Sequence, residues 1–339
     1  MWDNPIYFYA AVGYVVEIYS IFFIYVILTQ SSKDIGLYKW AVLKLAISET
    51  FFSFVLINVV SPDVFIPPPA ACCRGWLTST QGTCKIGVMM SFMAPTICFA
   101  SVNDCSFLRL FLLNNDQTKI DFFFSWKGGL LLLVVHVVLC AAIGSVTMLS
   151  MTDGKELRGY LDSMGGRNSL GSYVNATEYP VVAFLPTNIF YYITLLVLFV
   201  GFISFTTVNA TIAYKCWRRI NEGSRSMSKK TRNLQWNFTY MLIVQTVYPP
   251  IAICIPCMIC CALLVFSSGL PDLSKLLLLT TLLILLYPLI SASCCIYFIG
   301  PYKKYIMRIT RIDRLLRRMN YSQNKNTLTQ VSSISRENI

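Results

Sequence analysis

Residues 233–257 read NLQWNFTYMLIVQTVYPPIAICIPC, a run of apolar side chains interrupted by glutamines and prolines. The run is long enough to cross a bilayer as a helix, which takes about 20 residues. Proline in a helix interior removes the hydrogen bond to the carbonyl group four residues back. Each carbonyl freed in this way needs a partner on a neighbouring helix, a hydroxyl group or water. The stretch therefore predicts a membrane helix with a built-in hinge.

The whole chain is too apolar for a soluble domain of its size. Of its 339 residues, 55% are hydrophobic and only 13% are charged, whereas about a quarter is charged in a typical soluble domain. Seven stretches reach the length of a membrane helix. They cover residues 7–28, 39–60, 86–108, 129–150, 187–213, 235–265 and 275–299. We therefore predict an all-α membrane protein, with a seven-transmembrane helix bundle over residues 1–300.

The basic residues predict the orientation of this bundle. All but six of the 28 lysines and arginines fall on one side of the predicted spans, which is the cytoplasmic side by the positive-inside rule. The N-terminus is then outside, and we read no removable signal peptide there. The net charge of +12 fits a membrane surface rather than nucleic acid. Asn175, in the long outer loop, begins a glycosylation sequon on the side predicted to be extracellular.

The tail after the last span differs from the rest. Residues 301–319 read PYKKYIMRITRIDRLLRRM, with apolar residues at three- and four-residue spacing and basic residues on the other face. This pattern predicts an amphipathic helix on the inner leaflet, although the same composition can bind calmodulin. Residues 320–339 are polar and predict a disordered cytoplasmic tail.

We find no residue cluster or motif in the sequence that predicts catalysis or metal binding. The one histidine, His136, lies in an apolar span and cannot supply the several ligands of a metal hydrolase, so we expect a hydrogen-bonded packing residue. Cys254, Cys257, Cys260 and Cys261 have metal-like spacing but no basic neighbour to favour the thiolate. Nucleotide-binding and hydrolase motifs are also missing. We expect no enzyme activity, no cofactor and no metal site.

Ionisable and polar residues inside the spans are the first candidates for a functional site. Glu17 and Glu49 lie near the middle of the first and second spans. They either touch a water-filled bundle interior or are neutral, hydrogen-bonded structural groups, and the sequence leaves both readings open. Gln245 can hydrogen-bond to another span. We expect Lys44 to reach back to the inner surface along its aliphatic chain.

The prolines of the opening stretch define the predicted hinge of the sixth helix. Pro249 and Pro250 would free two carbonyl groups, and Pro256 a third. The lower half of the helix leads into a basic inner loop. A change at its outer half could thus pass to a cytosolic partner, although a static kink would explain the prolines equally well.

Four stretches in order resemble the nematode chemosensory seven-helix receptors of the Srh, Sri and Str groups. The opening stretch is similar to the sixth helix of that family. YKWAVLKLAIS at 38–48 resembles the entry to its second helix, and VSPDVFIPPPAACCRGWL at 60–77 resembles its proline-rich first outer loop. YPLISASCCIYFIGPYKKYIM at 287–307 resembles the seventh helix running into the tail helix. The likeness covers about residues 10–310.

The resemblance implies a G-protein-coupled receptor of the plasma membrane, in the cilia of sensory neurons, that binds a small environmental molecule. Where the Srh-like group ends its third helix in a Phe-Glu-Asn-Arg-type motif, this chain reads SVNDCSFLRLF at 101–111, and Arg109 can take the place of the arginine. The long outer loop lacks the cysteine of the usual bridge. Cys84 can instead pair with Cys72 or Cys73.

The resulting mechanism is a shift between two bundle states. The ligand prefers one state, the sixth helix swings at its hinge, and the inner loops expose a surface for a heterotrimeric G protein. The candidates for this surface are Arg109, Arg218, Arg219, Lys229 and Lys230. The alternative function is a transporter or ion channel with Glu17 and Glu49 on an ion path, against which stand the odd number of spans and the lack of inverted repeats.

Overall fold

The structure is a computed structural model of the whole chain. It describes residues 5–31, 35–65, 70–76, 78–163, 179–222, 228–251, 255 and 274–310. Asn175, Pro256, the four cysteines between 254 and 261, and the predicted tail beyond residue 310 lie outside these residues.

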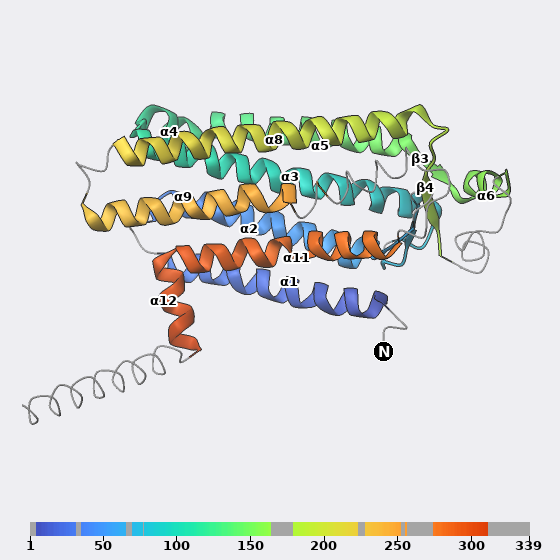
Figure 1. Cartoon of the computed structure of the whole chain (residues 1–339), viewed down its shortest axis with the longest axis horizontal. Helices are drawn as coiled ribbons and strands as arrows, with labels where there is room; N and C mark the ends of the chain where they lie inside the picture. The colour runs from blue at the N-terminus through green and yellow to red at the C-terminus, as the bar shows by residue number, and fades with distance from the viewer. Residues whose placement is uncertain are drawn as a thin grey trace, which may run out of the picture.

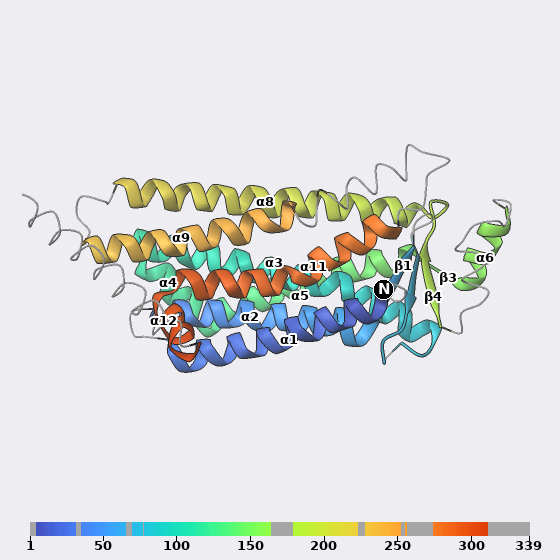
Figure 2. The same cartoon turned by 60° about the horizontal axis from the view of Figure 1, so that its bottom comes forward.

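Long helices running side by side make up most of the molecule (Figure 1). They are α1 (Pro5–Gln30), α2 (Tyr38–Phe54), α3 (Gln81–Asn114), α5 (Trp126–Ser150), α8 (Ile189–Glu222), α9 (Lys229–Pro249) and α11 (Ser274–Phe298). α2 continues as the π-helix η1 (Val55–Val60). In the two views of Figures 1 and 2, long helices that follow one another along the chain run in alternating directions, as expected for a chain that crosses a membrane repeatedly.

The long helices pack in a closed ring, and α3 also contacts helices that are not next to it in the ring. Successive contacts join α1 to α2, α2 to α3, α3 to α5, α5 to α8, α8 to α9, α9 to α11 and α11 to α1. α3 also packs against α8. The largest buried apolar cluster includes Phe23, Leu45, Leu108, Met241 and Ile299, and so joins α1, α2, α3, α9 and the end of α11.

Six helices in the described part of the chain are long and apolar enough to cross a membrane. They correspond to the predicted spans except the sixth, 235–265, of which α9 is the described portion. Many of their apolar side chains are exposed, especially on α5 and α8. In a membrane protein such surfaces face lipid rather than water.

One end of the bundle is covered by a small antiparallel sheet that we did not expect from the sequence. Its strands are β1 (Pro62–Phe65), β2 (Ala70–Cys73), β3 (Met151–Asp153) and β4 (Val181–Phe184), in the order β1-β2-β4-β3. α6 (Gly154–Ser163) packs on the sheet through Leu157 and Leu161. We call this end of the bundle the sheet end, and the first turn of α1 also lies there (Figure 1).

Close backbone contacts fix the sheet to the second span. Ser61 turns the chain out of η1 in the left-handed conformation, with φ 41°. Gly75 donates its N–H to the carbonyl of Val60 at 3.0 Å. A Cβ atom on Gly75 would stand 1.9 Å from the carbonyl oxygen of Val59, so only glycine permits this approach.

The opposite end, which we call the α12 end, carries two short helices. α4 (Gln117–Phe124) is capped at its N-terminus by Asp116, whose carboxylate accepts a hydrogen bond of 3.2 Å from the backbone N–H of Lys119. α12 (Gly300–Ile309) turns away from α11 and has proline in its first turn. Its Tyr302 is buried and shares a hydrogen bond of 2.7 Å with Ser31 at the end of α1.

Candidate functional site

Glu49 lies in the interior of the bundle, on α2. Its residue surface is only 2% exposed. The carboxyl group faces the hydroxyl groups of Ser291 and Tyr287 on α11. Within the described residues, its Oε1 atom and the hydroxyl of Tyr287 are buried without a hydrogen-bond partner. Glu49 is therefore an interior polar group rather than one directed at lipid.

Gln245 joins the same place from α9. Its Nε2 atom donates a hydrogen bond to Ser291 Oγ at 3.0 Å and one to Cys295 Sγ at 3.5 Å. Its Oε1 atom is buried and unpartnered in the described part of the chain. We call Glu49, Gln245, Tyr287, Ser291 and Cys295 the central cluster. It connects α2, α9 and α11 in the middle of the bundle.

Three polar atoms of the central cluster have no hydrogen-bond partner among the described residues. A buried polar atom without a hydrogen bond costs about 1–3 kcal/mol, and three such atoms converge here on different helices. A ligand that offers donors to the oxygens of Glu49 and Gln245 and an acceptor to the hydroxyl of Tyr287 could satisfy them. Glu49 and Gln245 were predicted pocket residues, but their sequence positions do not indicate that Ser291 lies between them.

Glu17, the third pocket candidate, lies apart from the central cluster. Its Oε1 atom accepts a hydrogen bond of 2.5 Å from Nδ2 of Asn58 in η1. Near this contact α1 and η1 come very close, because a Cβ on Gly13 would stand 2.5 Å from the side chain of Ile57. The geometry thus gives Glu17 a helix-packing partner and separates it from Glu49 and Gln245.

α9 ends at the predicted hinge. The helix extends to Pro249, and Pro250 and Ile251 have π-type geometry. One turn earlier, Thr246 donates its hydroxyl to the carbonyl of Leu242 at 2.8 Å. Tyr248 donates its hydroxyl to the carbonyl of Leu283 at 3.0 Å, which ties this end of α9 to α11.

Arg109 forms a second polar contact of α9, nearer the α12 end. Its Nη2 atom donates to the backbone carbonyl of Gln235 at 3.0 Å and also to the side-chain oxygen Oε1 of the same residue. The guanidinium group stands 5.0 Å from the ring centroid of Phe238, within the range of a cation–π contact. Because Arg109 is only 3% exposed, it holds α3 and α9 together instead of contributing to an open surface.

The other basic candidates are placed differently. Arg218 and Arg219 are exposed on the last turns of α8, and Arg218 Nε lies 2.6 Å from the carboxylate of Glu222. Lys229 is exposed at the start of α9. Lys230 lies in the same first turn, and its side chain is outside the described part. These residues all lie at the α12 end.

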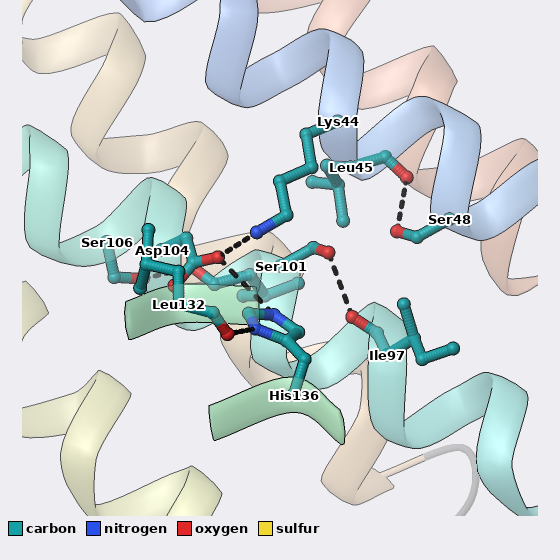
Figure 3. Close-up of polar contacts among 10 residues, drawn as sticks. Lys44, Leu45, Ser48, Ile97, Ser101, Asp104, Ser106, Leu132 and His136 are labelled. Atoms are coloured by element: carbon teal, nitrogen blue, oxygen red, sulfur yellow. Dashed lines mark hydrogen bonds and ion pairs between the residues drawn. The ribbon is translucent and has the colours of Figure 1, made fainter. Parts of the chain in front are cut away.

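Figure 3 shows a charged group that the sequence analysis missed. Asp104, on α3, receives Lys44 Nζ at 2.5 Å and lies 3.4 Å from His136 Nε2. Lys44 thus has an acidic partner one helix away that its sequence neighbourhood did not indicate, and the prediction that it reaches toward the inner surface stays a prediction. A charged residue inside an apolar span was the signal that could have identified Asp104.

At the sheet end, Cys73 and Cys84 form a disulfide bond. The bond joins β2 to the first turn of α3, so it is Cys73 and not Cys72 that bonds to Cys84. Nearby, Lys85 Nζ and Asp153 Oδ1 form an ion pair of 2.6 Å between α3 and β3. The disulfide and the ion pair connect the sheet to α3, and the strand pairs join its four strands to one another.

A known family accounts for this architecture. The model of the serpentine type 7TM GPCR chemoreceptor family Srh matches residues 2–312, which is most of the chain. The chain belongs to the Srh chemoreceptor family. No curated protein sequence matches it.

The Srh membership fits the geometry described above. The chain is therefore a multi-pass membrane protein with the seven-transmembrane fold, and it is a chemosensory, GPCR-like receptor. The family is one of chemoreceptors and not an enzyme family. In the described part of this Srh receptor, no group of three or more His, Cys, Asp or Glu side chains is placed to hold a metal ion.

Proposed function

We propose that this Srh receptor binds a small, largely apolar environmental molecule in the half of the bundle near the sheet and signals to a heterotrimeric G protein through movement of α9. The observation that carries the proposal is that α9 bears two buried polar contacts, one with α11 and one with α3. Gln245 belongs to the central cluster, and Gln235 binds Arg109. The two glutamines are ten positions apart, or about 15 Å along a helix.

The proposed orientation has the sheet end outside the cell and the α12 end in the cytosol. Two independent features support it. Disulfide bonds persist in oxidising compartments, and the Cys73–Cys84 bond lies at the sheet end. Basic side chains prefer the cytoplasmic face, and Arg218, Arg219 and Lys229 lie at the α12 end.

The mechanism couples the central cluster to the contact at Arg109. A ligand that satisfies the unpartnered atoms of Glu49, Gln245 and Tyr287 would favour a different position of α9, with Pro249, Pro250 and Pro256 as the hinge. That movement would separate Gln235 from Arg109. The basic surface of Arg218, Arg219, Lys229 and Lys230, together with the released Arg109, would then bind the G protein.

The remaining assignments complete the proposal. The receptor would act in the plasma membrane, in the cilia of sensory neurons. Residues 1–300 would form the receptor domain, with Asn175 as a glycosylation site. Residues 301–319 would lie on the inner leaflet, and 320–339 would be a disordered tail. In support, α12 presents Lys303, Lys304 and Arg308, and anionic lipids attract basic residues of this kind by about 1 kcal/mol each.

The contact at Arg109 allows a test that does not depend on knowing the ligand. Replacing Gln235 by alanine removes the side-chain acceptor, so α9 should leave α3 more easily. We expect ligand-free nucleotide exchange on a purified heterotrimeric G protein to rise several-fold, measured with the receptor in nanodiscs. Asn237→Ala is the matched control, because Asn237 is an exposed amide on the same helix. Equal basal exchange in wild type and Gln235→Ala, with normal surface expression, would contradict the proposal.

A further inference from the structure

The tryptophans in the described part of the chain lie toward the two ends of the bundle. Trp40 is the third residue of α2, Trp126 is the first residue of α5, Trp217 lies near the end of α8, and Trp236 lies seven residues after the start of α9. Trp76 follows β2 at the sheet end. The exposed fractions of Trp40, Trp76, Trp126 and Trp217 are 51%, 68%, 74% and 45%. Large indole rings are thus uncovered at both ends, and none lies in the middle of the described helices.

Trp217 and Trp236 lie level with the last turns of α3. Trp236 packs against a buried apolar cluster that contains Leu113 of α3 and Cys216 of α8. Trp217 follows Cys216 directly in α8. The end of α3 therefore marks the height of both rings along the bundle.

Trp40 and Trp126 lie at a similar height. Lys44 of α2 and His136 of α5 both meet Asp104 on α3 (Figure 3). α2 and α5 run opposite to α3 (Figures 1 and 2). Trp40, four residues before Lys44, and Trp126, ten residues before His136, therefore lie opposite the stretch between Asp104 and the end of α3.

The two tryptophan levels are separated by about the thickness of a bilayer. The backbone N–H of Trp76 donates to the carbonyl of Asn58 at 3.2 Å. From Trp40 to Asn58 the chain is helical through α2 and η1, and at 1.5 Å per residue that stretch is about 27 Å long. The hydrocarbon core of a bilayer is about 30 Å thick. Glu49 of the central cluster lies midway between the two levels.

The chemistry of these rings fits lipid headgroups better than a protein partner. Indole is large and apolar but carries one N–H donor, so it favours the boundary between hydrocarbon and water. Lys39 Nζ lies 4.9 Å from the ring centroid of Trp40, and Lys303 Nζ lies 4.3 Å from that of Tyr297 near the end of α11. Ammonium groups at this height can meet lipid phosphates. A protein partner would cover one side of the bundle, whereas the tryptophans lie on four helices around the ring.

We propose that Trp40, Trp126, Trp217 and Trp236 form an aromatic belt that binds the phospholipid headgroup layer of one leaflet, while Trp76 lies in the headgroup layer of the other leaflet. The belt fixes the depth of the bundle in the membrane. The sheet then stands outside the hydrocarbon core on the side of Trp76.

The belt also determines which parts of α8 and α9 stand in water. Glu222 lies five residues past Trp217, or about 8 Å along α8. Lys229 lies seven residues before Trp236, or about 10 Å along α9. The end of α8 and the start of α9 therefore project beyond the headgroups, on the side that the proposed orientation makes cytosolic.

Nitroxide labels on either side of Trp217 test this boundary in the full chain. Labels attached through noncanonical residues replace Ala210 and Asn221, which are both exposed on α8. In nanodiscs of phosphatidylcholine and phosphatidylserine, we expect the label at 210 to collide mainly with oxygen dissolved in the lipid. The label at 221 should collide mainly with a water-soluble nickel chelate. If both labels favour the same collision partner, the proposed depth is wrong.

Fluorescence quenching locates the indole rings themselves. Four receptors each keep one belt tryptophan, with phenylalanine at every other tryptophan position, and a fifth keeps Trp76 alone. Each should be quenched more strongly by a nitroxide on the lipid headgroup than by one at the end of an acyl chain. Stronger quenching from the acyl-chain end, or no quenching from either depth, would remove that tryptophan from the interface. Should these variants fail to fold, the labels at 210 and 221 decide alone.

Neither measurement uses a receptor ligand or a G protein. A negative result here leaves the proposed function untouched, and a failure of the Gln235→Ala test leaves the aromatic belt untouched.

Discussion

The two ends of the helix bundle are held together by different kinds of contact. At the sheet end, antiparallel pairing joins β1–β4 into one sheet, and a disulfide and an ion pair tie that sheet to α3. At the α12 end, α3 and α9 are joined through the side chain of Arg109 and a backbone and side-chain oxygen of Gln235. The first set constrains the chain even when side chains rearrange, whereas the second can be broken by moving one helix. A conformational change is therefore expected at the α12 end.

Removing the disulfide should have the largest effect on stability, because it weakens the fixed end. Replacing Cys73 and Cys84 by serine removes a bond between β2 and α3, and loss of a native disulfide typically costs about 2–5 kcal/mol. We expect a lower melting temperature of the purified receptor. Cys294→Ser, at a partly buried cysteine on α11, is the control. Equal melting temperatures for the double variant and the control would mean that the sheet end is not the more constrained one.

The fold and the site could be predicted from the sequence to different extents. Six of the seven predicted spans correspond to long apolar helices, because length and hydropathy are local properties. The sheet could not be predicted in this way. Its strands are three or four residues long, and β2 pairs with β4 across more than a hundred residues, with Ala71 opposite Val182.

The interior contacts show the same limit. Sequence analysis identified Glu49 and Gln245 separately, but their meeting at Ser291 depends on the rotation of three helices. Lys44 lies 60 residues from Asp104, and only packing of α2 on α3 brings them together. Arg109 was predicted to belong to the G-protein face, but its spacing could not reveal that it is buried against Phe238.

Disrupting the central cluster should lower the stability of the receptor by an intermediate amount. The loss would show whether the constrained sheet end extends as far as the contact between α9 and α11. Gln245→Ala removes the donor to Ser291 and leaves buried polar groups without partners, which costs about 1–3 kcal/mol. Thermal unfolding of the purified receptor measures this loss. Gln117→Ala, at an exposed site on α4, should change stability much less. If the two variants are equally stable, Gln245 does not link α9 to α11 in the way described.

The smallest effect is expected at the start of α4, in the loop region of the α12 end. The side-chain hydrogen bond to Lys119 holds the pKa of Asp116 below its usual range. A lowered pKa in the folded state stabilises the fold at pH values above the unfolded value, about 3.9, and that contribution is lost as the pH falls through the folded value. Hydrogen exchange in residues 117–124 should thus be independent of Asp116 titration at pH 6–8. Relative to the intrinsic exchange rate at each pH, protection should fall only below about pH 4, and this acid-dependent loss of protection should be absent in Asp116→Ala.

The difference between a fixed and an opening end is tested most directly by two distances in one receptor. Spin labels attached through noncanonical residues at positions 114 on α3 and 233 on α9 report on the α12 end, and labels at 82 on α3 and 279 on α11 report on the sheet end. We predict that Gln235→Ala, or binding of nucleotide-free G protein, lengthens and broadens the 114–233 distance and leaves the 82–279 distance unchanged. An unchanged 114–233 distance, or equal changes at both ends, would contradict the account.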